Sequence, residues 1–339
     1  MFHYVPLALI VIVLLAWCID WINGFHDTAN AIATVVSTGV LPGRIAVMMA
    51  AVLNFVGALM GTQVATTIAK GIADTQFVVP AVIVAALLAA IVWDLLTWWF
   101  GIPSSTSHTL MGGLAGAVVA HAGFKALHVH KLEEIGAFIV ISPLLGFAIA
   151  SVLIISILWI VRRMSPHKVN FAFKKLQLVS AAGMAFTHGQ NDAQKAMGVI
   201  CLGLITYKFL PGGSAKVVVP LWVKFGCAIM MGLGTATGGW KIIKTLGHRI
   251  AKLRPIHGFA AETAAAIVLF TTAHLGIPVS TTHSITGSIM GVGASMNASA
   301  VKWGLAGNIF VAWVLTIPVS AGLAALFYKI IAPLFMHPM

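Results

Sequence analysis

Two short motifs place an aspartate beside amide side chains within apolar sequence. GFHDTANA contains Asp27 and GQNDAQKA contains Asp192, and the two aspartates lie 165 residues apart at matching positions. A carboxylate at the centre of a bilayer costs at least about 2.5 kcal/mol on insertion scales, so a matched pair indicates a function. Carboxylates and the nearby amides of Asn30 and Asn191 can bind a hard cation, and a carboxylate can also carry a proton. The pattern predicts a cation-coupling site at Asp27 and Asp192, with sodium or a proton as the cation.

A second pair of motifs is rich in hydroxyl side chains. GIPSSTSHTLMG begins at Gly101 and GIPVSTTHSITG begins at Gly276, 175 residues further on. Pro103 and Pro278 suit the start of a helix, where free backbone N–H groups and the helix dipole attract an anion. Plain N-capping would explain one such segment, whereas the duplication favours two helix starts that face each other around a tetrahedral oxyanion. The predicted anion-binding residues are Ser104, Ser105, Thr106, Ser280, Thr281, Thr282, Asn30 and Asn191.

Further polar residues lie in or next to these motifs. His26 precedes the first aspartate and joins the predicted cation-coupling set. An imidazole can titrate near neutral pH or orient a neighbouring hydroxyl, although a structural hydrogen bond to the backbone explains such a residue equally well. The remaining residues predicted to assist the site are His108, His283, Gln194 and Lys195.

The two kinds of motif oppose each other electrostatically. Two carboxylates repel an anion bound beside them, and a cation or proton bound at Asp27 and Asp192 removes that repulsion. Cation binding then favours anion binding, and the reverse holds by linkage. The combination predicts symport of an anion with a cation.

The composition defines what kind of protein must position these residues. Of 339 residues, 60% are hydrophobic and 8% are charged, against roughly 25% charged in a typical soluble domain. This excludes an ordinary soluble enzyme, a disordered chain and a secreted disulfide scaffold. One span needs about 20 apolar residues, so we expect an all-α polytopic membrane protein, in contact with lipid, with about ten transmembrane helices. The net charge of +12 does not indicate nucleic-acid binding, because apolar segments separate the basic residues.

The repeated motifs divide the chain into two halves. We predict a first membrane repeat over residues 1–161, a basic cytoplasmic loop over 162–175 and a second membrane repeat over 176–339. Duplicated halves with polar, glycine-rich breaks at matching places are typical of secondary transporters, which bind their substrate between the halves near the membrane midplane. The positive-inside rule places two basic clusters on the cytoplasmic side. These clusters are Arg162, Arg163, Lys168, Lys174 and Lys175, and Lys241, Lys244, Arg249, Lys252 and Arg254.

The motifs resemble the duplicated signature of the PiT family of inorganic phosphate transporters, usually written with a GANDVANA core. GFHDTANA and HGQNDAQKAMG match the two signature copies, and the GIPxST(S/T)H segments look like the family's second repeated element. The four copies appear in the expected order over nearly the whole chain. The resemblance implies two inverted repeats, two re-entrant helical hairpins, cation-coupled import of inorganic phosphate and a homodimer in the cell's inner (plasma) membrane.

The resemblance also implies roles for individual residues. Asp27, Asn30, Asn191 and Asp192 would handle the coupling cation and help to form the phosphate site, with sodium held at the two aspartates. The phosphate-facing hydroxyls would be those of Ser105, Thr106, Ser280 and Thr281. No cofactor is implied apart from the coupling cation, and no enzymatic activity.

The chain departs from the signature at three positions. His26 replaces the motif asparagine in the first copy, and Gln194 and Lys195 replace alanine and asparagine in the second. These changes resemble the bacterial low-affinity branch, which is associated with proton coupling and with transport of metal–phosphate complexes. Lys195 could stand in for a second cation.

Other functions compete with phosphate symport. A sulfate permease of the same fold is the nearest alternative, but sulfate carries no proton at neutral pH. A site that also accepts a hydrogen bond from phosphate would use the carboxylates of Asp27 and Asp192, which favours phosphate. An intramembrane hydrolase would need one catalytic site, whereas the sequence has two equivalent copies, and a passive channel would not need paired carboxylates.

Overall fold

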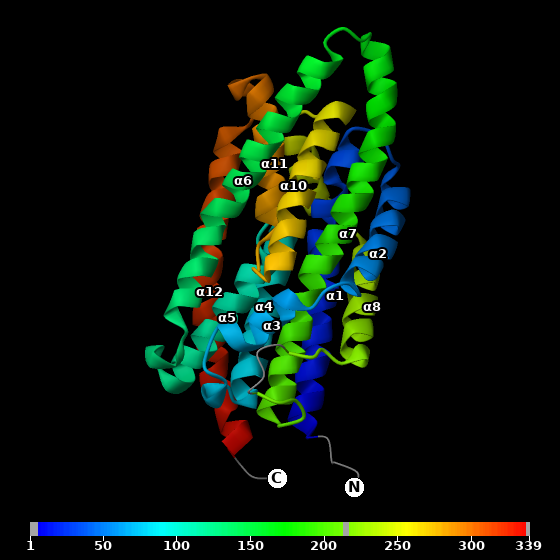
Figure 1. Ribbon diagram of the computed structural model, residues 1–339. Helices are drawn as coiled ribbons and strands as arrows, with labels where there is room; N and C mark the ends of the chain where they lie inside the picture. Colours follow the sequence, from blue (N-terminus) through cyan, green and yellow to red (C-terminus); the bar gives the residue numbers. More distant parts are fainter. Residues whose placement is uncertain (1–5, 213–216, 337–339) are drawn as a thin grey trace.

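The structure is a computed structural model that describes residues 6–212 and 217–336, which form a bundle of helices (Figure 1). Within the described residues, extended backbone pairing is limited to an isolated bridge between Ala73 and Leu127. The all-α prediction is therefore confirmed. The first half contains α1 (Leu7–Ser37), α2 (Gly43–Ala58), α3 (Gln63–Gly71), α4 (Pro80–Phe100), α5 (Thr106–Ala122) and α6 (Val129–Val161). The second half contains α7 (Pro166–Thr206), α8 (Leu221–Thr237), α9 (Trp240–Lys244), α10 (Pro255–Leu275), α11 (Thr281–Met296) and α12 (Trp303–Met336).

The sequence repeat is visible in the bounds of the helices. α4 and α10 each have 21 residues, begin 175 residues apart with a first-turn proline, and end at Gly101 (φ 66°) and Gly276 (φ 70°). Glycine adopts this left-handed conformation without a Cβ clash, which lets the chain turn away at the helix end. α5 and α11 then begin at Thr106 and Thr281, again 175 residues apart. In Figure 1, α1 rises from the lower end of the molecule whereas α7, its counterpart, descends from the upper end.

Several helices are long and apolar enough to cross a membrane. By length and composition, α1, α4, α6, α10 and α12 qualify, and α2 with α3 makes a sixth span if this pair, bent by 69°, is counted as one. The predicted count of about ten is not confirmed by this criterion. α7 has 41 residues but carries the polar motif and basic residues, and α5 and α11 have only 17 and 16 residues.

Two helical hairpins enter the bundle from opposite ends. α4 packs against α5 and α10 packs against α11, and the chain reverses between the helices of each pair. In Figure 1 the α4–α5 pair lies in the lower half and the α10–α11 pair in the upper half, so their tips approach near the middle. A helix of 17 residues is about 26 Å long, shorter than a hydrocarbon core of about 30 Å. The re-entrant nature of the two hairpins stays a prediction.

Matched glycines lock each hairpin to a helix of the other half. α5 packs against α12, and a Cβ at Gly116 would lie 2.1 Å from the Ala321 carbonyl oxygen. α11 packs against α6, and a Cβ at Gly291 would lie 2.3 Å from the Phe147 carbonyl oxygen. Small residues at such contacts let backbones approach closely. The hairpin tips are therefore held by helices from both halves.

The connection between the halves is shorter than predicted. α6 ends at Val161 and α7 begins at Pro166, so residues 166–175 of the predicted loop form the first turns of α7. Pro166 suits a first helical turn, which explains why the helix begins there. Arg162 and Arg254 line the same cavity, which places an end of each basic cluster at the same end of the molecule, as the positive-inside rule predicts.

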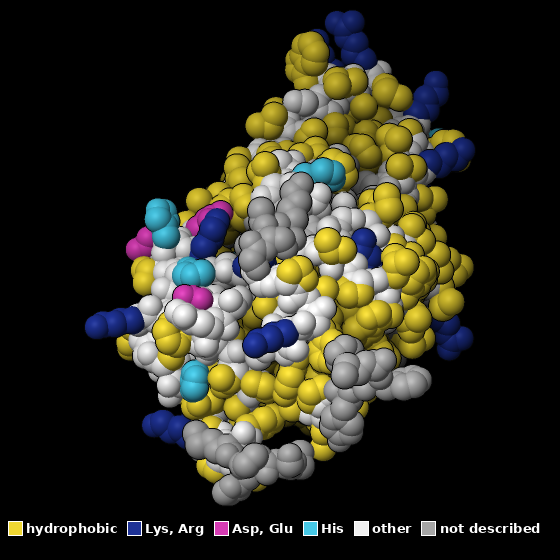
Figure 2. All heavy atoms as spheres, turned by 60° about the horizontal axis from the view of Figure 1, so that its bottom comes forward, with side chains coloured by type: hydrophobic (Ala, Val, Ile, Leu, Met, Phe, Trp, Pro, Cys, Tyr) yellow, Lys and Arg dark blue, Asp and Glu magenta, His cyan; other side chains and the backbone are white. Residues whose placement is uncertain are grey.

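The outer surface is consistent with a lipid environment. Figure 2 shows a broad hydrophobic area along the side of the molecule, with acidic, basic and histidine side chains gathered on part of the lower end. Large hydrophobic side chains such as Trp99, Ile160 and Leu334 are more than half exposed. Exposed apolar patches of this extent are unusual on soluble monomers. A multi-pass membrane protein accounts for them.

Candidate functional site

The two hydroxyl-rich segments meet at the hairpin tips. The ring centroids of His108 and His283 are 4.8 Å apart, and Ser107 Oγ donates a hydrogen bond to the Val279 carbonyl oxygen (3.2 Å). Ser105 and Ser280 are the N-caps of α5 and α11, and their hydroxyls accept from the backbone N–H groups of the two histidines (3.2 and 3.3 Å). The two helix starts therefore face each other.

The prolines do not start these helices, which corrects the sequence prediction. Pro103 and Pro278 lie in the extended segments that lead into α5 and α11, before the capping serines. The serine side chains satisfy the first N–H groups, so the helices begin one residue after them. Trp313 Nε1 donates to the Pro103 carbonyl oxygen (2.9 Å), which fixes the first of these segments against α12.

The carboxylate of Asp27 lies at the junction of both hairpin tips with α1. Its Oδ1 is 2.8 Å from His26 Nδ1 and accepts from Thr282 Oγ1 (3.4 Å). Its Oδ2 accepts from Thr106 Oγ1 (3.2 Å), which also donates to Asn23 Oδ1 (2.8 Å). One hydroxyl from each hairpin therefore contacts the first aspartate.

The carboxylate of Asp192 is arranged in a corresponding way on α7. Thr281 Oγ1 donates to Asp192 Oδ2 (3.2 Å), and His188 Nε2 lies 3.4 Å from the same oxygen. Lys195 Nζ lies 2.5 Å from Asp192 Oδ1 and also donates to Ser107 Oγ. The lysine thus joins the second-half aspartate to the first-half hairpin.

Amide side chains complete the cluster. Asn30 Nδ2 donates to Thr281 Oγ1 (3.1 Å) and to Thr282 Oγ1 (2.9 Å), and Asn191 Nδ2 donates to the Leu269 carbonyl oxygen (3.3 Å). The Oδ1 atoms of Asn30 and Asn191 are buried and accept no hydrogen bond from the described residues. Such oxygens can coordinate a hard cation or accept a proton-bearing oxygen of an anion.

The same cluster could hold a cation. Ligand atoms of Asp27, His188 and Asp192 all lie within 4.8 Å of one another, and all three residues are buried. The ammonium group of Lys195 already supplies one positive charge at Asp192. Hydroxyl donors, helix N-termini and this ammonium can bind an oxyanion, while the carboxylates favour a cation or proton beside it.

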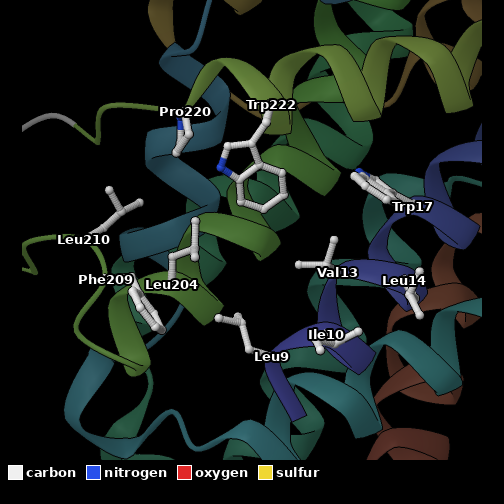
Figure 3. Close-up of a pocket in the computed structure, with 10 residues that line it drawn as sticks. All are labelled: Leu9, Ile10, Val13, Leu14, Trp17, Leu204, Phe209, Leu210, Pro220 and Trp222. Atoms are coloured by element: carbon white, nitrogen blue, oxygen red, sulfur yellow. The ribbon is translucent and has the colours of Figure 1, made fainter. Parts of the chain in front are cut away.

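An apolar cavity lies elsewhere. It has a volume of about 510 Å³ and is lined by Leu9, Ile10, Val13, Leu14, Trp17, Leu204, Phe209, Leu210, Pro220 and Trp222 (Figure 3). These side chains come from α1, the last turn of α7, the segment between α7 and α8, and the first turn of α8. They include no carboxylate, hydroxyl or basic group, so this cavity cannot supply the chemistry of the motif cluster.

Comparison with known proteins identifies the family. A family model described as "Phosphate transporter family" matches residues 23–324, which include all four motif copies. The chain belongs to this phosphate transporter family. The family comprises transporters and not enzymes, so the alternative of an intramembrane hydrolase is set aside.

Relatives within the family match almost end to end. A probable low-affinity inorganic phosphate transporter of Rhizobium meliloti is 48% identical, over 94% of this chain and 95% of that protein. A protein of the same name from Bacillus subtilis is 47% identical, over 96% and 98%. A solved structure described as "The sodium-dependent phosphate transporter" superposes with a TM-score of 0.87 at 25% identity and covers 97% of this chain and all of that one.

Some residues that carry the family resemblance lie outside the central cluster. Ser104 Oγ donates to Thr97 Oγ1 (2.8 Å) and lies 3.4 Å from His26 Nε2, so it sits behind the histidine. Gln194 Oε1 accepts from the Val64 backbone N–H (2.8 Å), which ties α7 to the first turn of α3. The central cluster contains Asp27, His26, Asn30, Thr106, Thr281, Thr282, Asp192 and Lys195, while Ser105, Ser280, His108, His283 and Asn191 border it.

Other residues of the site were not predicted from the family motifs. Asn23, Asp27 and Asn30 are spaced by four and three residues and share one face of α1, which is a readable helical signal. His188 precedes the second motif by one residue, and Asn54 Oδ1 lies 3.0 Å from its Nδ1. Asn54 comes from α2 and has no repeated counterpart in the motifs, so only the tertiary structure reveals it.

Proposed function

We propose that the chain imports inorganic phosphate across the cell membrane by symport with a cation. The family and the names of its relatives support phosphate as the substrate. The observation that supports coupling to a cation is the position of the two aspartates. Both accept hydrogen bonds from hydroxyls at one hairpin tip, since Thr282 donates to Asp27 and Thr281 donates to Asp192. An anion held by these hydroxyls lies beside two carboxylates and needs positive charge next to it.

The donors in the cluster suit a phosphate ion. Thr281, Thr282 and Thr106 offer hydroxyls, Asn30 offers an amide N–H and Lys195 offers an ammonium group. Phosphate also carries a proton at neutral pH and can donate it to a carboxylate or to an amide oxygen. Sulfate carries none, and it would leave those acceptors facing an anion. This difference favours phosphate over the sulfate permease.

The coupling cation is a proton or a sodium ion held near Asp27, His188 and Asp192. A structural neighbour named as sodium-dependent supports cation coupling in general. Linkage then makes cation binding and phosphate binding favour each other. The opposite directions of α1 and α7 support two inverted repeats, which can exchange roles as the site opens to one side and then to the other.

The remaining features stay predictions. The end that carries Arg162 and Arg254 would face the cytoplasm, with the chain in the inner membrane. The family resemblance further implies a homodimer and a metal–phosphate complex as the transported species.

Uptake into proteoliposomes tests the proposal. The purified protein is reconstituted, and labelled phosphate is supplied under a proton gradient or a sodium gradient, with and without excess sulfate. Accumulation that is driven by one gradient and resists sulfate supports phosphate symport. Entry of labelled sulfate without phosphate uptake would reassign the substrate, and downhill movement that neither gradient drives would indicate a channel.

A further inference from the structure

A further buried carboxylate, beyond those of Asp27 and Asp192, lies next to the site without taking part in the cluster. Asp94 belongs to α4 and is 1% exposed. Neither carboxylate oxygen accepts a hydrogen bond from any of the described residues. By contrast, Asp27 and Asp192 both accept hydrogen bonds. A buried carboxylate that is ionised without accepting a hydrogen bond is in a costly state.

The surroundings of Asp94 suit the protonated acid. Thr109 lies beside the carboxyl group, but its hydroxyl proton is donated to the Ser105 carbonyl oxygen (2.9 Å). The hydroxyl of Thr97 likewise has the carbonyl oxygens of Trp93 and Asp94 as acceptors (both 3.1 Å). The Thr109 oxygen keeps acceptor capacity, which a protonated Asp94 can use and an ionised one cannot, whereas Thr97 Oγ1 already accepts from Ser104 Oγ.

Asp94 is close enough to the site to sense its charge. The charged and titratable groups that act on it are His26 and Asp27 from α1 and Lys195 from α7. The ammonium group of Lys241, on α9, lies over the rings of Trp98 and Trp99, which follow Asp94 on α4. α5 and α12 also pack against α4. Their titratable groups, His108 and His121 on α5 and Tyr328 and Lys329 on α12, are not among those that act on Asp94.

A line of hydroxyls connects this position with the site. Thr97, one turn beyond Asp94, has its Oγ1 3.2 Å from His26 Nε2, and Ser104 Oγ donates to Thr97 Oγ1 (2.8 Å). His26 in turn contacts Asp27. A change of charge at Asp94 therefore reaches the anion-binding cluster through fixed, buried groups, where screening by solvent is weak.

We propose that Asp94 carries the co-transported proton, bound while phosphate occupies the site and released after phosphate leaves. This inference rests on the proposed function and names its coupling ion. The protonated acid adds no charge beside the anion, whereas the ionised form adds one negative charge near Asp27 and weakens phosphate binding. In each cycle Asp94 takes a proton from water on the side where phosphate binds and so forms one O–H bond. On the other side that O–H bond breaks, and the proton passes to water, where a new O–H bond forms.

The test compares the wild type with Asp94→Asn and Asp94→Glu in proteoliposomes and in solution. Asp94→Asn mimics the protonated acid permanently, so we expect phosphate exchange without a gradient to persist while proton-driven accumulation is lost. Asp94→Glu restores a titratable group and should recover part of the accumulation. Phosphate affinity in the wild type should fall relative to Asp94→Asn as pH rises, by up to about tenfold per pH unit, the limit for one linked proton.

Asp20→Asn is the matched control. Asp20 is also 1% exposed and its carboxylate oxygens are also without a donor among the described residues, but the groups around it are Cys227, Asp192 and Lys195. We expect this variant to keep proton-driven accumulation. A pH indicator in weakly buffered solution supplies a binding readout, since phosphate should trigger proton uptake by the wild type and less by Asp94→Asn.

Several outcomes would overturn the assignment. The assignment is wrong if Asp94→Asn accumulates phosphate under a proton gradient as well as the wild type does. It is also wrong if both Asp94 variants lose phosphate exchange and accumulation together. If only Asp20→Asn loses proton-driven phosphate accumulation, the transported proton belongs to Asp20 and not to Asp94. A wild-type protein driven by sodium only would refute this inference and leave phosphate symport intact, whereas a wild-type protein that moves no phosphate would refute the proposed function itself.

Discussion

The ammonium group of Lys195 lies 2.5 Å from the carboxylate of Asp192, and both side chains are almost completely buried. The same ammonium donates to Ser107, at the tip of the opposite half's hairpin. A fixed positive charge therefore sits where the family signature has an asparagine. This contact distinguishes the two otherwise similar halves of the site, because the matching residue on α1 is the neutral Asn30.

Replacement of Lys195 by asparagine should change the ion requirement. Loss of one partner from a buried ion pair costs about 3–5 kcal/mol when the other charge stays uncompensated. We expect Lys195→Asn to lower the melting temperature and phosphate uptake, with sodium restoring part of both because it can replace the ammonium at Asp192. Lys131→Asn, which removes an exposed lysine paired with Glu134, serves as the control. Uptake unaffected by Lys195→Asn would remove the lysine from the mechanism.

Neutralisation of either central aspartate should abolish accumulation. Asp27→Asn and Asp192→Asn keep the side-chain shape but remove the negative charges through which cation or proton binding favours phosphate binding. We expect concentrative phosphate uptake to fall to background while the protein stays in the membrane at normal amounts. Glu134→Gln alters an exposed carboxylate and should take up phosphate normally. Normal accumulation by both aspartate variants would contradict the proposed coupling.

The hydroxyls of the second hairpin should determine substrate affinity. Thr281→Val and Thr282→Val preserve the side-chain volume and remove a donor, which is worth about 1 kcal/mol for a neutral hydrogen bond and more to an anion. We expect KM for phosphate to rise at least about fivefold in initial-rate uptake assays. Thr272→Val is the control, since its hydroxyl bonds only to its own helix, at the Val268 and Leu269 carbonyls.

The capping serines should affect stability as well as affinity. Ser105→Ala and Ser280→Ala remove an N-cap, which costs about 0.5–2 kcal/mol, and loosen a helix start that faces the anion. We expect a lower melting temperature together with a higher KM for phosphate. A raised KM with no change in melting temperature would mean that the serines contact the anion rather than cap the helices.

Replacement of glycine by alanine should destabilise the protein only where the glycine packs closely against a neighbouring helix. A Cβ at Gly116 or Gly291 would overlap the backbone of α12 or α6, so Gly116→Ala and Gly291→Ala should lower the melting temperature and reduce uptake. Gly136 and Gly304 have open space where the methyl group of an alanine would lie, and alanine there should be neutral or stabilising by up to about 1 kcal/mol. Equal effects at all four positions would argue against the proposed interlocking of the halves.

Part of the site was readable from the chain because duplication repeats its chemistry. Asp27 and Asp192 stand out through matched motifs, and both lie in the central cluster. Thr281 and Thr282 were found in the same way. Asn54 was not, because a contact between α2 and α7 leaves no periodic trace in either helix. His188 lies one turn before Asp192 on α7, a spacing that is readable from the chain. Ser104 and Gln194 lie inside motifs, yet their side chains bond to Thr97 and to the start of α3.

The amino-acid sequence by itself determined the membrane class, the duplication and the kinds of groups at the site. These follow from composition, from apolar segment length and from residue identity, all of which are local properties of the chain. Only the tertiary structure decided which hydroxyls donate to which aspartate and that the Lys195 ammonium contacts the carboxylate of Asp192. The tertiary structure also placed Asp94 beside the site, without a donor among the described residues. These relationships depend on how α1, α7 and the two hairpins pack, and packing brings together residues whose separation along the chain carries no information about their distance in space.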